Sequence, residues 1–142
     1  MNANELTTRV VGRVLTTVIL VLALATAYVH LTLGGTIFLL NGIGYLVLAG
    51  GVAATALPIG FLRGLRWLPR LGLAGFALTT IGAYLVIGPH FTLGWATKAI
   101  ELAIIGVVAA DLINTYGSAR RLERRGSVGR TRFEPSVQIP VE

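Results

Sequence analysis

The sequence predicts an all-α integral membrane protein in which four transmembrane helices form an antiparallel bundle. Its 142 residues are 54% hydrophobic and only 13% charged, and the mean hydropathy is +0.77. A soluble domain of this length cannot bury so much apolar surface. The apolar residues also gather into long runs, without the period-two alternation of a membrane-spanning β-strand. Because backbone polar groups in lipid need internal partners, these runs predict helices.

The first two helices are expected at about residues 10–33 and 36–62. A glycine pair, Gly34 and Gly35, separates them and is typical of a tight turn. The second run contains no charged residue. Pro58 is expected to kink or loosen its last turn, because proline lacks the backbone N–H that continues a helix.

The third helix is expected at about residues 71–88, where Gly88 and Pro89 stop it, and the fourth at about residues 93–116. Gly117 is the predicted C-cap of the fourth helix, since glycine favours the left-handed conformation that ends many helices. Residues 1–116 thus form the predicted transmembrane domain. Residues 117–142 read as a basic, largely disordered cytoplasmic tail.

The arginines predict the orientation in the membrane. They fall before the first helix, between the second and third, and after the fourth, whereas the other two connections carry no lysine or arginine. The positive-inside rule therefore predicts a multi-pass protein of the plasma (inner) membrane with both termini in the cytoplasm. Because the basic residues lie at helix ends and in the tail, the sequence predicts no nucleic-acid partner despite the net charge of +6.

A short internal repeat accompanies the two predicted hairpins. Residues 30–34 read His-Leu-Thr-Leu-Gly and residues 90–94 read His-Phe-Thr-Leu-Gly. At the same offset, Asn41 corresponds to Glu101. The chain is thus either a duplicated helical hairpin or a low-complexity apolar sequence in which a five-residue echo arose by chance, and both interpretations stay open.

Glu101 is the most informative polar residue. It lies six residues after Trp95, or about 9 Å inward from the predicted outer interface at ~1.5 Å per residue. Intramembrane carboxylates often mark ion, proton or substrate paths. The alternative is a local pair with Lys98, one turn earlier. Asn41 and Tyr45, which share a helix face, complete the candidate intramembrane polar site.

His30 and His90 form a candidate outer-face site, because both lie at the outer ends of predicted ascending helices. Two histidines at one level suggest a metal or haem, while interfacial histidines also serve as polar caps. We assign no cofactor, and metal binding stays an open question. Asp111 and Asn114 are expected at the inner boundary, within reach of water, and outside any site.

The chain carries no cysteine and no recognisable catalytic motif, so the sequence predicts a protein that is not an enzyme. The first functional hypothesis is an accessory subunit of a membrane complex or a homo-oligomer, joined to a protein partner or to itself through glycine-rich helix faces. The second is a small transporter or channel with Glu101 as its polar centre. The third is a redox or quinone-linked, or haem-binding, subunit that uses His30 and His90.

Overall fold

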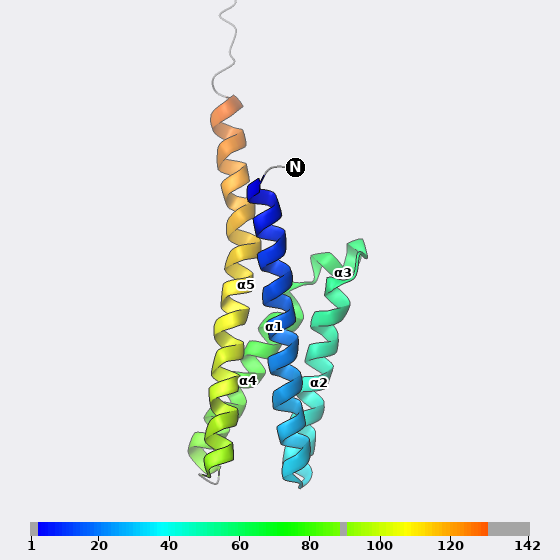
Figure 1. Ribbon diagram of the computed structural model, residues 1–142, viewed down its shortest axis with the longest axis vertical. Helices are drawn as coiled ribbons and strands as arrows, with labels where there is room; N and C mark the ends of the chain where they lie inside the picture. The colour runs from blue at the N-terminus through cyan, green and yellow to red at the C-terminus, as the bar shows by residue number, and fades with distance from the viewer. Residues whose placement is uncertain (1–2, 89–90, 131–142) are drawn as a thin grey trace, which may run out of the picture.

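The computed structural model describes residues 3–88 and 91–130, with side chains as far as Gly117 except that of Asn4. Within these ranges the chain is all-helical, as predicted, and has no strand (Figure 1). Three helices are long and apolar enough to cross a membrane, within Glu5–Leu33, Thr36–Ala56 and Trp67–Ile87. The helices are α1 (Ala3–Leu33), α2 (Thr36–Ala56), α3 (Gly60–Gly64), α4 (Trp67–Ile87) and α5 (Thr92–Arg130).

The turn between α1 and α2 depends on its glycine pair. Gly34 and Gly35 have φ angles of 71° and 85°, in the left-handed region that side chains disfavour. Two residues therefore suffice to reverse the chain. At its other end, α1 begins at Ala3 rather than near residue 10, so the first helix is longer than predicted.

The second predicted helix is too long. Its regular part ends at Ala56, and Leu57 is extended with ψ of 152°, because the residue before a proline is driven out of the helical region. The chain then forms the separate short helix α3. Helix α4 begins at Trp67 rather than residue 71. It accommodates Pro69 because the first backbone N–H groups of a helix have no partner to lose.

The predicted end of the last helix is wrong. Helix α5 continues through Gly117 to Arg130, so Gly117 is not a C-cap. A glycine inside a helix costs only ~1 kcal/mol relative to alanine, and alanine, arginine, leucine and glutamate, all good helix formers, follow it. Residues 131–142 of the predicted tail lie outside the described residues.

The long helices pack through neighbouring pairs. Helix α1 contacts α2 and α5, and α4 contacts α5 and α2. The beginning of α1 and the end of α5 lie at one end of the molecule, here called the terminal end; the α1–α2 turn and the beginning of α5 lie at the other, the turn end (Figure 1). Alanines recur among the buried residues, whereas leucines and valines are exposed along every long helix. This pattern is typical of packing in lipid.

The glycines of α2 and α4 differ in what surrounds them. A Cβ atom on Gly44 would lie 2.5 Å from Cζ of Phe76, whereas a Cβ on Gly75 would have no neighbour within 4 Å. Phe76 is held by an edge-on contact with Tyr45, with 5.0 Å between ring centroids. Gly44 therefore allows α2 and α4 to approach closely, while Gly75 faces open space.

We accordingly expect Gly44→Leu to lower the free energy of unfolding in detergent by ~1–3 kcal/mol, because overpacking displaces Phe76. Gly75→Leu is the matched control and should leave the melting temperature nearly unchanged. Thermal unfolding followed by circular dichroism measures both. If both changes destabilise the protein equally, or if neither change destabilises it, the assignment of the close contact to Gly44 is contradicted.

Candidate functional site

In the described part of the chain, two groups of buried or half-buried polar side chains lie between the long helices. The Glu101 cluster, near the turn end, consists of His30, Tyr45, Thr80, Lys98 and Glu101. The Arg70 cluster, closer to the terminal end, consists of Thr16, Thr55, Arg70 and Asp111. Each cluster takes residues from all four long helices. Charged groups in an apolar interior persist only when partners or function compensate for their desolvation.

Glu101 is completely buried, with an exposed fraction of 0%. Its Oε2 atom accepts a hydrogen bond of 2.6 Å from Nζ of Lys98, one turn earlier on α5. Its Oε1 atom lies 3.7 Å from Nε2 of His30 on α1 and has no hydrogen-bond partner among the described residues. One carboxylate oxygen is thus satisfied and the other is not.

The protons of the neighbouring groups can be assigned from their partners. Nδ1 of His30 lies 2.9 Å from the carbonyl oxygen of Thr26, which only accepts, so Nδ1 carries a proton. Thr80 donates its hydroxyl proton to the carbonyl oxygen of Ala77. The Tyr45 hydroxyl, 3.0 Å from Oγ1 of Thr80, therefore donates to Thr80. Tyr45 has no second proton to give to Glu101.

In neutral His30 the Nε2 atom then carries a lone pair that faces Oε1 of Glu101. Two acceptors in this position repel each other. One additional proton, on either His30 or Glu101, removes the repulsion and connects the two groups.

A cavity of about 230 Å³ adjoins the Glu101 cluster at the turn end. Lys98, His30 and Thr80 belong both to the cluster and to the cavity wall, and Asn41 lines it as well. The rest of the wall is mainly apolar and comes from the turn ends of the long helices and from residues just outside α4 and α5: Leu33, Ile37, Phe38, Ala83, Tyr84, Ile87, Gly88, Phe91, Gly94 and Thr97.

The structure brings most of the predicted site residues together. Glu101, Lys98 and Tyr45 share one cluster, and Asn41 lies in the wall of the adjoining cavity. His30, which we assigned to a separate outer-face site, belongs to this cluster too. His90 lies outside the described residues. Nδ1 of His30 faces the carbonyl oxygen of Thr26, and Nε2 faces Oε1 of Glu101.

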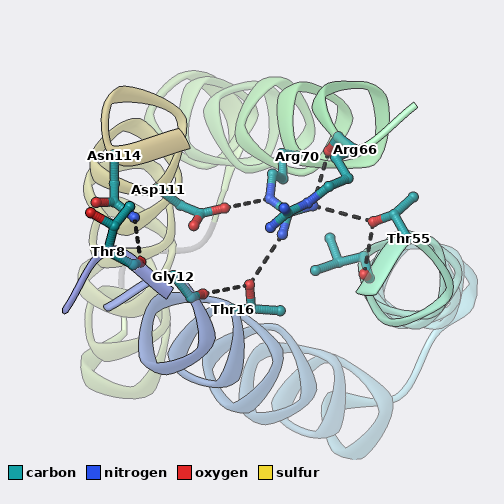
Figure 2. Close-up of polar contacts among 9 residues, drawn as sticks. Thr8, Gly12, Thr16, Thr55, Arg66, Arg70, Asp111 and Asn114 are labelled. Atoms are coloured by element: carbon teal, nitrogen blue, oxygen red, sulfur yellow. Dashed lines mark hydrogen bonds and ion pairs between the residues drawn. The ribbon is translucent and has the colours of Figure 1, made fainter. Parts of the chain in front are cut away.

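The Arg70 cluster was not predicted. Arg70 is only 1% exposed, and its Nε atom donates to Oδ2 of Asp111 at 2.5 Å. Its remaining nitrogens donate to Thr55 at 3.2 Å, to Thr16 at 3.1 Å and to the carbonyl oxygen of Arg66 at 3.0 Å. Figure 2 shows Arg70 at the centre, with Asp111 and Thr55 on opposite sides. One guanidinium thus connects α1, α2, α4 and α5.

The two threonines are oriented for this role. Thr16 donates its proton to the carbonyl oxygen of Gly12 and Thr55 to that of Val52, both at 2.9 Å. Each hydroxyl therefore turns a lone pair toward Arg70 (Figure 2). Asp111 is 0% exposed, so the expectation that it reaches water at the inner boundary is wrong.

Sequence reasoning missed the Arg70 cluster because Arg70 was counted with the loop arginines that indicate topology. A signal was available. Pro69 starts a helix more readily than it continues one, which would have placed Arg70 inside α4. Asp111, the second acid of a long apolar run, then needed a cation from another helix.

Comparisons of this chain with protein-family models, with curated proteins and with solved structures give no match. The site is therefore interpreted from its own geometry.

The Arg70 cluster generates a stability prediction. Arg70→Met should lower the free energy of unfolding by ~3–5 kcal/mol, because it leaves the Asp111 carboxylate buried without its cation. The double variant Arg70→Met with Asp111→Leu should be more stable than Arg70→Met alone. Chemical unfolding in detergent measures the cycle.

Arg63→Met is the matched control, because Arg63 is an exposed arginine of α3, and such surface changes usually stay within ~0.5 kcal/mol. Additive losses in the double variant would show that Arg70 and Asp111 stabilise the fold independently, contrary to this interpretation.

Proposed function

We propose that this chain is a four-span protein of the plasma membrane that binds a small solute in the cavity beside Glu101 and carries it across the bilayer. In this proposal α1, α2, α4 and α5 are the spans of an antiparallel bundle, and both termini are cytoplasmic. The observation that carries the function is Glu101 itself, a fully buried carboxylate with one unpartnered oxygen beside an accessible cavity.

The charges of α5 support its role as the fourth span. Lys98, Glu101 and Asp111 lie within its apolar part, which is costly if they face lipid. Glu101 and Asp111 are fully buried, and each is paired with a cation. Helix α5 thus directs these carboxylates into the protein and leaves apolar residues such as Leu102 and Ile113 exposed.

The two clusters have complementary properties for transport. The cavity lies at the turn end, which the arginine distribution assigns to the outer side. The Arg70 cluster fills the interior closer to the terminal end with direct hydrogen bonds. A solute would therefore enter from outside and meet Lys98, the partner of Glu101, while the Arg70 cluster closes the inner side.

The accessory-subunit or homo-oligomer hypothesis draws less support from the helix faces. Gly42, Gly44, Gly51 and Gly72 approach neighbouring helices of the same chain. Gly75 and Gly82 on α4 have no neighbour within 4 Å and leave a face on which a second subunit could pack. Self-association of the transporter through this face stays a prediction, as does the redox hypothesis based on His30 and His90.

The proposed orientation predicts a labelling pattern. Thr36 and Thr92 lie at the turn end and Gly64 lies in α3, before α4, and the chain has no native cysteine. Thr36→Cys and Thr92→Cys should react with a membrane-impermeant thiol reagent in intact cells, whereas Gly64→Cys should react only after permeabilisation. Labelling of Gly64→Cys in intact cells would reverse the orientation.

The proposed transport predicts the effect of removing the carboxylate. In a thermal-shift screen of small organic acids, amines and neutral solutes, at least one class should raise the melting temperature of the wild type. A radiolabelled member should enter proteoliposomes under an imposed pH gradient. Glu101→Gln should reduce the uptake rate at least tenfold, because the site loses its ionisable group.

The double variant Lys98→Met with Glu101→Gln separates transport from a purely structural pair. If the pair were only structural, the double variant would fold well and transport at the wild-type rate, since neither charge is stranded. That result, or the absence of any stabilising solute class, would refute the proposed function.

A further inference from the structure

Lys98 is the charged group that the cavity presents to a solute. Its side chain lines the cavity, whereas Glu101 lies behind it and contributes no lining atoms. One N–H of the ammonium group is used on Glu101 at 2.6 Å. The nitrogen also lies 5.5 Å from the centre of the Tyr84 ring, a favourable position for a cation. An ammonium has three donors, so Lys98 retains donors for a ligand.

The wall contains few other polar groups. Thr97 and Thr80 donate their protons to the carbonyl oxygens of Leu93 and Ala77, so their hydroxyls can only accept from other groups, and Thr80 already accepts from Tyr45. Asn41 also lines the cavity. Apolar side chains, among them Ile37 and Ile87, make up most of the remaining wall. The cavity thus combines a cationic donor at one end with an apolar body.

We propose that the solute is a small organic acid with an apolar body, bound as its carboxylate to Lys98 together with one proton held between His30 and Glu101. This inference rests on the proposed function and specifies its substrate class. The cavity of about 230 Å³ is smaller than the ~300–1,000 Å³ typical of sites for drug-sized ligands, so the ligand is of the size of benzoate.

The proton follows from charge balance in a buried site. The titratable groups around Glu101 are His30 from α1, Tyr45 from α2 and Lys98 from α5, and Tyr84 from α4 stands against Lys98. With neutral His30, the lysine and the glutamate cancel each other. A bound carboxylate adds one negative charge that burial disfavours. A proton taken up from the cavity-side water, between Nε2 of His30 and Oε1 of Glu101, restores neutrality.

The test compares three probes of nearly equal shape and different charge: benzoate, benzamide and benzylamine. Isothermal titration calorimetry on the detergent-solubilised wild type should show benzoate binding at least tenfold tighter than benzamide or benzylamine. Lys98→Met should weaken benzoate binding at least tenfold. Arg63→Met removes a cation remote from the cavity and should leave the affinity for benzoate unchanged.

Lys98 is the only lysine of the chain, which gives a test without mutation. Acetylation of Lys98 removes its charge and should abolish benzoate binding, whereas reductive methylation retains the charge and should preserve it. Mass spectrometry verifies the modification, and the melting temperature verifies folding.

Proton uptake is measured by repeating the titration in buffers of different ionisation enthalpy. We expect an uptake of about one proton per benzoate at neutral pH, and a lower uptake in a folded His30→Gln variant. Benzoate binding without proton uptake would overturn the shared proton. Tighter binding of benzylamine or benzamide than of benzoate would overturn the proposal that the solute is an organic acid, yet would leave a solute site. The absence of any stabilising solute class in the wider screen would refute the proposed function itself.

Discussion

The buried ion pair between Arg70 and Asp111 is the contact on which the arrangement of the helices depends. Most other core contacts involve alanine, valine or leucine side chains, which are nondirectional and tolerate rotation or sliding. Arg70, in contrast, needs groups from α1, α2 and α5 at defined positions. A displacement of any of these helices along its axis would leave a buried charge or hydroxyl without a partner, at a cost of kilocalories per mole.

The two clusters differ in what adjoins their buried carboxylates. Each nitrogen of the Arg70 guanidinium donates to a named acceptor, whereas Oδ1 of Asp111 is buried without a hydrogen-bond partner among the described residues. In the Glu101 cluster, Oε1 of Glu101 is likewise buried without a partner. Unsatisfied buried groups are rare in folded proteins. What distinguishes the Glu101 cluster is the cavity that adjoins it.

Local features of the sequence predicted much of the fold. The glycine pair at residues 34–35 and the break near Pro58 act through the conformation of their own backbone, so their effects are visible in a short stretch of chain. Glu101 could be recognised because a carboxylate in an apolar run is unusual by itself. The pairing of Arg70 with Asp111 could not be recognised in this way, because it joins residues 41 positions apart. The composition of either segment alone suggests a membrane boundary. The continuation of α5 beyond Gly117 was missed because one glycine was given more weight than the helix formers after it.

Helix α5 connects the two clusters physically. Glu101 and Asp111 are ten residues apart on this helix, or about 15 Å at ~1.5 Å per residue. At Asp111 the helix is held to α4 by the ion pair, and nearer its beginning it carries Glu101 and Lys98, with Lys98 in the cavity wall. The middle of α5 is thus held to α4 by a buried ion pair, while its beginning lies beside the cavity. Sliding of α5 along its axis would break this ion pair, so the Arg70 cluster fixes the position of α5 against α4.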